Sequence, residues 1–172
     1  WFEAKAAGNF PVIGLESDAG ELLGFASYGT FKPWAAFKYS VEHSVYVHHA
    51  HRGHGYGPTL LKALIEKARE QGVHLMIGGI DADNKASIEL HKRLGFVHAG
   101  TITQAGFKFG RWLDLAFYQL TLETPLNPLD GEGETQLASL SPDVAPTAER
   151  LEALRRLIGS LPLAQPLDED RI

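Results

Sequence analysis

The sequence has 172 residues, of which 44% are hydrophobic and 22% charged, so it suits one globular domain with a sizeable core. Its net charge of −5 argues against nucleic acid as a partner, because binding to phosphates needs a basic face. With no cysteine for disulfides or thiolate zinc sites and no apolar run of membrane-spanning length, we expect a cytoplasmic protein that contacts no membrane.

The first part of the chain predicts a short helix, a hairpin, a loop and a strand. "WFEAKAAG" is typical of a helix that Gly8 ends, and "PVIGLES" and "ELLGFASYGT" predict two strands joined at "DAG". "FKPWAAFKYS" predicts an aromatic loop. Residues 41–48 alternate with period two, which puts Glu42 on one face and His43 on the other.

The next part alternates helices with strands. We expect a helix over 58–71, with Pro58 at its first position and Gly72 as its cap. "VHLMIGGI" predicts a buried strand, and "DNKASIELHKRLG" predicts a helix that Asp83 or Asn84 caps and Gly95 ends. "FVHAGTIT" and "LDLAFYQLTL" predict strands, with "QAGFKFGRW" as the loop between them. This order indicates a layered α/β or α+β fold.

The composition changes near residue 123, so we expect a domain over 1–123 and a different segment over 124–172. Residues 124–146 are rich in Pro, Gly, Ser, Asp and Glu, which is typical of a linker. Leucine spacing predicts an amphipathic helix over 147–161, and the end of the chain reads as disordered.

Residues 51–60, "HRGHGYGPTL", place three glycines between a predicted strand and a predicted helix. The first N–H groups of a helix lack intrahelical acceptors and the helix dipole favours an anion there, so this pattern predicts a phosphate site. The sequence does not match the G-x-G-x-x-G motif of dinucleotide-binding proteins, because Leu60 stands where the last glycine belongs. It also has no G-K-[ST] of a P-loop. A glycine-rich connector without a ligand is the alternative.

Four segments of the chain carry a resemblance to the GCN5-related N-acetyltransferase (GNAT) family. "RGHGYG" is similar to the R-x-x-G-x-G that follows the family's fourth strand, and "DADNKASIELHKRLGF" is similar to its Asn-bearing segment and helix. Together with "SVEHSVYV" and "KFGRWLDL", they resemble the phosphinothricin and methionine sulfoximine acetyltransferase branch, from Trp1 to about Leu122. The resemblance implies a mixed sheet that splays between the family's fourth and fifth strands, with helices on both faces.

The same resemblance implies acetyl-CoA as the cosubstrate, without a metal. Backbone N–H groups of 53–58, except that of Pro58, would hold its pyrophosphate, and the strand around Val45 would pair with its pantetheine arm. The residues implied to bind acetyl-CoA are Val45, Tyr46, Val47, Arg52, Gly53, His54, Gly55, Tyr56, Gly57, Asn84 and Ser87. The resemblance also implies a homodimer. The relatives begin with an N-terminal strand and helix, which we expect to be missing from this chain.

Two residues are catalytic candidates. Glu42 occupies the position of the branch's catalytic glutamate and would act as general base, directly or through a water. The alternative is a solvated edge carboxylate, and a bulge in the strand would reverse the faces. His91 shares a helix face with Asn84 and Ser87 and stands where many relatives have a thiolate-protonating Tyr. The alternative is a histidine that packs beside leucines.

The acceptor site is predicted from cations and aromatic rings. An amino-acid acceptor carries a carboxylate, which a cation should meet. The candidates are Phe31, Lys32, Trp34 and Lys38 in the aromatic loop and Lys108, Arg111 and Trp112 further on; solvated lysines over packed aromatics are the alternative. The histidines at 43, 48, 49, 51 and 54 do not have the spacing of a zinc site.

These observations predict an acetyl-CoA-dependent N-acetyltransferase that acts by direct attack in a ternary complex, since no cysteine can carry the acetyl group. Its acceptor would be a small L-amino acid or an analogue such as methionine sulfoximine, methionine sulfone or phosphinothricin. Acetylation of peptides or other small amines is one alternative. A non-catalytic CoA-binding regulatory module is another.

Overall fold

The computed structural model describes residues 2–124. The predicted linker over 124–146, apart from Thr124, lies outside the described residues, as do the predicted helix over 147–161 and the predicted disordered end.

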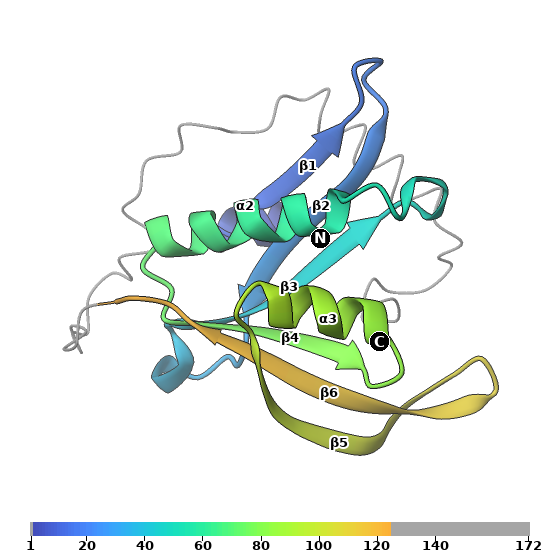
Figure 1. The fold of residues 1–172 in the computed structure, drawn as a ribbon. Coiled ribbons are helices and arrows are strands. Elements are labelled where there is room, and N and C mark those ends of the chain that lie inside the picture. Colours follow the sequence, from blue (N-terminus) through green and yellow to red (C-terminus); the bar gives the residue numbers. More distant parts are fainter. Residues whose placement is uncertain (1, 125–172) are drawn as a thin grey trace.

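A six-stranded mixed sheet forms the centre of the described chain (Figure 1). Its strand order is β1-β2-β3-β4-β6-β5, and neighbouring strands are antiparallel except for the parallel neighbours β3 and β4. The strands are β1 (Val12–Glu16), β2 (Leu22–Thr30), β3 (Ser40–Val47), β4 (Leu75–Asp81), β5 (Val97–Lys108) and β6 (Arg111–Thr121).

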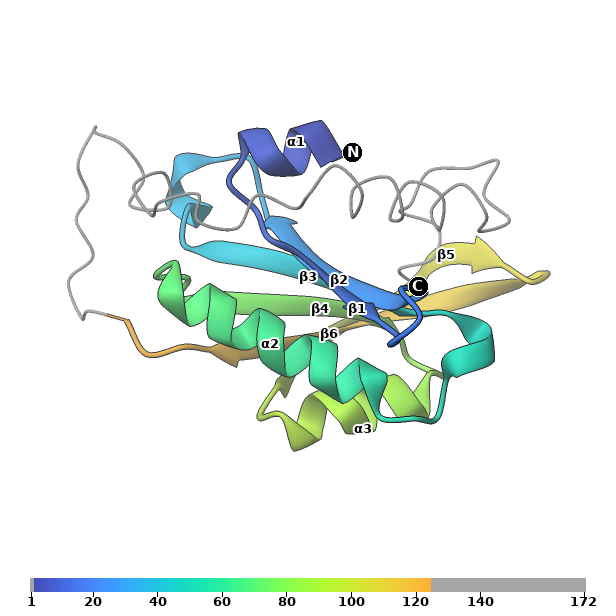
Figure 2. The ribbon, with the colours of Figure 1, turned by 90° about the horizontal axis from the view of Figure 1, so that it is seen from above.

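Helices lie on both sides of this sheet. Figure 2 shows α1 (Phe2–Ala7) on one side, and α2 (Tyr56–Glu70) and α3 (Lys85–Arg93) together on the other. Two short 3-10 helices, η1 (Ala35–Phe37) and η2 (His49–His51), lie in the loops on either side of β3. The fold predicted from the sequence, a splayed mixed sheet with helices on both faces, is confirmed.

The main core lies between the sheet and the helices α2 and α3. The predicted apolar stripe of α2 is fully buried, and it consists of Leu60, Leu61, Leu64, Ile65 and Ala68. It packs against strand residues such as Val41, Met76 and Ile80. A smaller cluster on Leu22 and Phe25, with Tyr46 beside it, lies apart from this core. Odd-numbered β3 residues such as Val41 therefore face the helices, and even-numbered ones face away.

Helix α2 begins two residues earlier than the sequence predicts. Its first residue is Tyr56, so Pro58 occupies the third helical position rather than the first. The prediction was wrong because it took proline as the start signal, although any of the first few positions tolerates a residue without an N–H. Gly72 follows the helix with φ +69°, and Asn84 caps α3, as predicted.

The predicted loop over 104–112 is wrong, because most of it is strand. β5 continues to Lys108 and β6 starts at Arg111, which leaves a two-residue turn, Phe109–Gly110, with φ of 54° and 74°. Such positive φ values at both turn residues are typical of a tight hairpin. The side chains here are mostly exposed on both faces, so the sequence lacks the alternation that marks a half-buried strand.

At the N-terminal helix, the residue in the left-handed region is Asn9 (φ 52°), not Gly8. Within the described part of the chain, no helix is both long enough and apolar enough to cross a membrane.

Candidate functional site

The two parallel strands at the centre of the sheet separate soon after they begin. β3 and β4 pair only at Ser40–Leu75, Val41–Met76 and Glu42–Ile77, although β3 continues to Val47 and β4 to Asp81. Figure 1 shows the two strands diverging from that point. We call the last paired position, Glu42–Ile77, the splay point.

Glu42 therefore lies at the splay point itself. The register between β2 and β3 is unbroken from Thr30–Val41 to Gly24–Val47, so no bulge reverses the faces of β3. Glu42 faces away from α2 and α3 and is half-buried. A Cβ built on Gly79 of β4 would lie 3.5 Å from Glu42 Oε1, which places the carboxylate above the neighbouring strand.

The glycine-rich loop follows β3 and the short helix η2 and leads into α2. Gly53 and Gly55 have φ of +82° and +81°, and a Cβ added at either would meet nothing within 4 Å. Glycine is therefore required at both positions because of the positive φ and not because neighbouring atoms crowd the Cα. Gly55 is the N-cap of α2, and Tyr56 and Gly57 are its first residues, so their N–H groups have no acceptor within the helix.

Side chains of the loop hold its shape. Arg52 donates from Nε to the backbone oxygen of Val47 at 3.3 Å. His54 Nδ1 lies 3.0 Å from the carbonyl oxygen of Arg52 and 3.2 Å from that of His51, so Nδ1 carries the hydrogen. The ring of His54 also stacks on Tyr56. The loop is thus an exposed turn of N–H groups at a helix N-terminus, which suits an anion.

Beyond the splay point, β3 presents the predicted pantetheine segment. Val45 and Val47 pack against the main core on the side of the helices. Tyr46 points to the other side and stacks on Phe25 with the ring centroids 5.0 Å apart.

The predicted residues of α3 lie on one face, as their spacing indicates. The Oδ1 atom of Asn84 accepts a hydrogen bond from the backbone N–H of Ser87 at 3.1 Å, so Asn84 acts as the helix cap. The hydroxyl of Ser87 lies 3.5 Å from His91 Nδ1.

His91 is buried, with 5% of its surface exposed, and lies against His43. The two ring planes lie within 19° of parallel with their centroids 5.1 Å apart, and their Nε2 atoms are 3.2 Å apart. His91 Nδ1 lies 2.7 Å from the carbonyl oxygen of Ser87. Burial lowers the pKa of His91, and the hydrogen bond to Ser87 opposes this only in part. The sequence singled out His91 but not its partner His43, nor Gly78, over which both rings lie.

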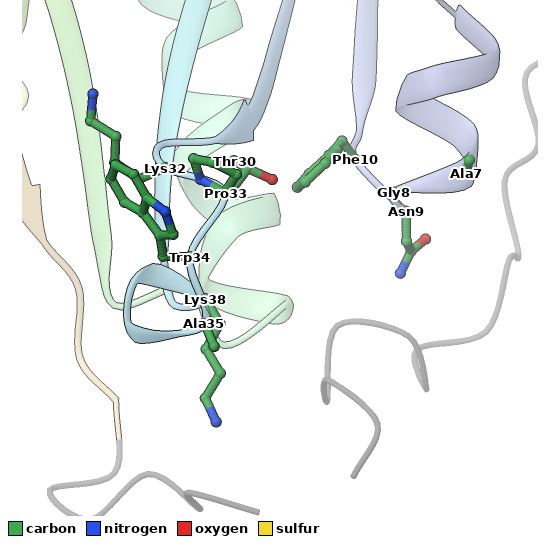
Figure 3. Close-up of a pocket in the computed structure, with 10 residues that line it drawn as sticks. All are labelled: Ala7, Gly8, Asn9, Phe10, Thr30, Lys32, Pro33, Trp34, Ala35 and Lys38. Atoms are coloured by element: carbon green, nitrogen blue, oxygen red, sulfur yellow. The ribbon is translucent and has the colours of Figure 1, made fainter. Parts of the chain in front are cut away.

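The aromatic loop borders a cavity of about 330 Å³ (Figure 3). Lys32, Trp34 and Lys38 line it from the loop, and Phe10 and the end of α1 line it from the other side. Phe31 instead packs edge-on against Phe37, with Lys32 Nζ above its ring. The cavity lies near the start of β3, because Phe31 N–H donates to the backbone oxygen of Ser40.

The second polar and aromatic group lies on the β5–β6 hairpin and does not line this cavity. Arg111 pairs with Asp81 and Asp83 at 3.0 Å each. Trp112 packs edge-on against Phe107, and Lys108 Nζ lies above the ring of Phe109. Over residues 2–124, no cluster of three or more His, Asp or Glu side chains suits a metal ion.

Comparisons with known proteins agree on one family. The sequence profile of the acetyltransferase (GNAT) family matches residues 1–96, more than half of the chain. The L-methionine sulfoximine/L-methionine sulfone acetyltransferase of Pseudomonas paraeruginosa is 53% identical over 123 residues, which are 72% of either protein. The resemblance and the fold expected from the sequence are thereby confirmed.

Two solved structures are similar to this chain as well. The yncA protein of Salmonella typhimurium, solved with its cofactor acetyl-CoA, has a TM-score of 0.73 and 46% identity, over 76% of this chain and 75% of that one. A phosphinothricin acetyltransferase of Sinorhizobium meliloti, in complex with acetyl-CoA, has a TM-score of 0.72 and 34% identity, over 76% and 71%.

Proposed function

This chain belongs to the acetyltransferase (GNAT) family, and from that premise we propose that it acetylates the α-amino group of a small L-amino acid or an analogue. Methionine sulfoximine, methionine sulfone and phosphinothricin are the acceptors of this type. The names of the Pseudomonas paraeruginosa and Sinorhizobium meliloti relatives support this choice. Acetyl-CoA supplies the acetyl group as a reactive thioester.

One observation carries the proposal. The carboxylate of Glu42 lies at the splay point, and the same strand, β3, leads from there to the glycine-rich N-terminus of α2. Glu42 is the last β3 residue paired with β4, and Gly53 to Gly57 follow the end of the same strand. A pyrophosphate at the loop and a thioester near Glu42 would lie at the two ends of β3. Residues 45–47 would run beside the pantetheine arm that joins them.

The residues of the loop fit an anionic cosubstrate. Gly53 and Gly55 turn the backbone, the first N–H groups of α2 supply donors, and Arg52 adds a positive charge. Asn84 and Ser87, at the start of α3, are proposed to contact the pantetheine arm.

Two side chains are proposed to handle the protons. Acetylation of an ammonium group forms an N–C bond, breaks the C–S bond and frees two protons, of which the leaving thiolate takes one. Glu42 would take a proton from the amine, and His91 would pass one to the sulfur. Since burial lowers the pKa of His91, its imidazole is neutral near pH 7 and must accept a proton before it gives one.

The acceptor is proposed to bind beside the aromatic loop. Lys32 and Lys38 line the cavity of about 330 Å³, and Trp34 adds an apolar wall. Their ammonium groups lie over the rings of Phe31 and Tyr39, so the two side chains would turn toward a bound carboxylate. A carboxylate fits such cations, and the volume lies within the range of small-molecule sites. Phe31 would support this wall from behind, through its contact with Phe37.

The β5–β6 hairpin is proposed to contact a second copy of the chain in a homodimer. Phe107, Phe109 and Trp112 are 62%, 82% and 59% exposed, which is much apolar surface for a two-stranded hairpin. Lys108 and Arg111 lie between them. Light scattering should give twice the chain mass, and the double variant Phe107→Ser, Trp112→Ser should give a monomer.

The proposed location is the cytoplasm, since a chain without cysteine suits a reducing compartment. Nucleic acid is not a proposed partner, because the chain carries a net charge of −5.

A thiol-release assay tests the proposed function. The purified chain and acetyl-CoA are mixed with methionine sulfoximine, methionine sulfone, phosphinothricin, the standard L-amino acids, short peptides or polyamines. The proposal expects release of CoA with the amino acids and analogues. Release with peptides alone would replace it with peptide acetylation, and acetyl-CoA binding without release would indicate a regulatory module.

A further inference from the structure

His43 and His91 form a buried contact on the side of the sheet opposite Glu42. His43 is the first β3 residue after the splay point and is 6% exposed. The ring of Phe96 stands edge-on to both imidazoles, with centroids 5.5 Å from His43 and 5.0 Å from His91. Tyr118 of β6 is a titratable side chain in ring contact with His91, with the ring centroids 6.5 Å apart.

The hydrogen-bond partners fix which nitrogen of each ring carries hydrogen. The carbonyl oxygen of Ser87 only accepts, so His91 Nδ1, at 2.7 Å from it, must donate. A neutral imidazole has one N–H, which leaves His91 Nε2 with a lone pair. His43 Nε2, at 3.2 Å, must then carry the hydrogen and donate it to His91.

Gly78 of β4 leaves the space in which the two rings meet. A Cβ built there would lie 2.7 Å from His43 Nε2 and 3.0 Å from His91 Nε2, closer than a side chain tolerates. Gly78 is also the first β4 residue after the splay point. The two Nε2 atoms thus lie beside the place where the strands separate, next to the residue pair that holds Glu42.

We propose that His43 is a positioning residue for acetyl transfer, whose Nε2–H fixes the ring plane and the tautomer of His91. This inference rests on the proposed function, because it takes His91 as the group that moves a proton near the sulfur. With His43 in place, His91 holds its hydrogen on the side of Ser87, and its Nε2 lone pair, at the splay point, accepts the hydrogen of His43 until a proton is taken up there. Without His43, a water molecule or the rotated ring of His91 would occupy that place. Both neutral tautomers of His91 would then be accessible.

An apolar side chain at position 43 would fill the same space and keep the packing with Phe96. A purely structural role would therefore tolerate leucine, whereas the proposed role needs a donor. This difference separates the two explanations.

The first test is the tautomer of His91 in the unmodified chain, read from the ring nitrogens by long-range 1H–15N NMR spectroscopy. The proposal expects the Nδ1–H tautomer for His91 and Nε2–H for His43. Hydrogen on Nε2 of His91 would overturn it. This result does not depend on any acceptor and stands even if no amine is acetylated.

The second test compares His43→Leu with His43→Gln, whose amide can donate from a similar place. Leucine should lower kcat by about 10- to 100-fold, which is ~1.4–2.7 kcal/mol in the barrier, and leave the KM for acetyl-CoA within about twofold. Glutamine should recover much of the loss. In a His91→Leu background, His43→Leu should lower kcat no further, because the two act as a unit.

Thermal unfolding of each variant shows that it is folded at the assay temperature. Equal kcat for leucine and glutamine, or independent losses in the double variant, would overturn the positioning role while amino-acid acetylation by the unmodified chain still supports the proposed function. Conversely, the expected tautomers in a chain that acetylates no amine would reject the proposed function and leave only the geometry of the two rings.

Discussion

Replacement of Gly78 by alanine would test whether the two histidines meet over an empty position of β4. The added Cβ would approach His43 Nε2 to 2.7 Å, His91 Nε2 to 3.0 Å and His43 Cε1 to 3.3 Å. These are ring atoms of packed side chains, and Phe96 and the bond to Ser87 limit their movement. At least one ring must therefore shift, and the Nε2–Nε2 contact should lengthen or break.

The expected net effect is a loss of stability. Alanine restricts the unfolded chain more than glycine does, which stabilises by about 0.4–1 kcal/mol where the backbone permits it, and Gly78 is not among the residues with positive φ. Overpacking costs about 1–3 kcal/mol, and a buried hydrogen bond left unmade costs a further ~1–3 kcal/mol. The sum favours a decrease of about 1–6 kcal/mol in the free energy of unfolding.

Urea unfolding measures this change, and Gly79→Ala is a matched control. Gly79 is the next residue of the same strand and points to the other face, where its Cβ would meet the flexible end of Leu115 at 3.2 Å and Glu42 Oε1 at 3.5 Å. We expect Gly79→Ala to stay within about 1 kcal/mol of the unmodified chain. If Gly78→Ala proves as stable as the control and its His91 ring-nitrogen signals do not move, the packing argument is refuted.

Three more results are expected. Glu42→Gln should lower kcat by about 10²–10⁴-fold and keep the KM for acetyl-CoA, as measured by thiol release; unchanged turnover would reject Glu42 as the base. Gly55→Ala and Gly72→Ala should each lose about 1–2 kcal/mol in urea unfolding, because both positions have positive φ and open surroundings, but only Gly55→Ala should weaken acetyl-CoA binding in calorimetry. The pKa of His91 is lower in the folded chain than in the unfolded chain, so as the pH falls His91 is protonated in the unfolded chain before it is protonated in the folded one. The free energy of unfolding should then drop below about pH 6.5, by up to ~1.4 kcal/mol per pH unit, and His91→Leu should flatten that slope.

Much of the fold followed from local patterns in the sequence. The helical spacing of Leu60, Leu61, Leu64, Ile65 and Ala68 gave the buried face of α2, and period-two alternation gave the faces of β3. The parallel strands and their divergence came from the family resemblance, because periodicity does not report which strands become neighbours. Both strands of the β5–β6 hairpin were predicted, but residues 104–112 at its turn end were taken as a loop, because exposure on both faces removes the alternation on which a strand prediction depends.

The candidate site was predictable along the chain but not across the sheet. The spacing of Ser87 and His91 predicts that they lie on one helix face, and in the structure the two side chains are neighbours. The partner of His91 is 48 residues away, and only the packing of α3 over β4 brings the two together. One signal was present: glycines 78 and 79 interrupt a buried strand, and glycine inside a strand often marks a close approach of other groups.

Arg111 shows the limit of residue type as evidence for a binding site. Its guanidinium suits a substrate carboxylate, but two protein carboxylates, of Asp81 and Asp83, already hold it in place. The arginine and Asp83 are largely exposed, so the pairs contribute little energy, and they still hold the turn end of the hairpin against the end of β4. Arg111 is thus better placed to orient the hairpin than to bind the acceptor.

The chemistry proposed for this site depends on the register of β3 more than on any single contact. Glu42 and His43 are consecutive, so they point to opposite sides of the sheet, one away from the helices and one toward His91. A slip of one residue would exchange them and bury the carboxylate in the apolar core, where an unpaired charge costs several kcal/mol. The unbroken pairing with β2 from Thr30 to Gly24 prevents that slip. The same pairing therefore keeps the half-buried carboxylate of Glu42 and the imidazole of His43, which contacts His91, on opposite sides of one splay point.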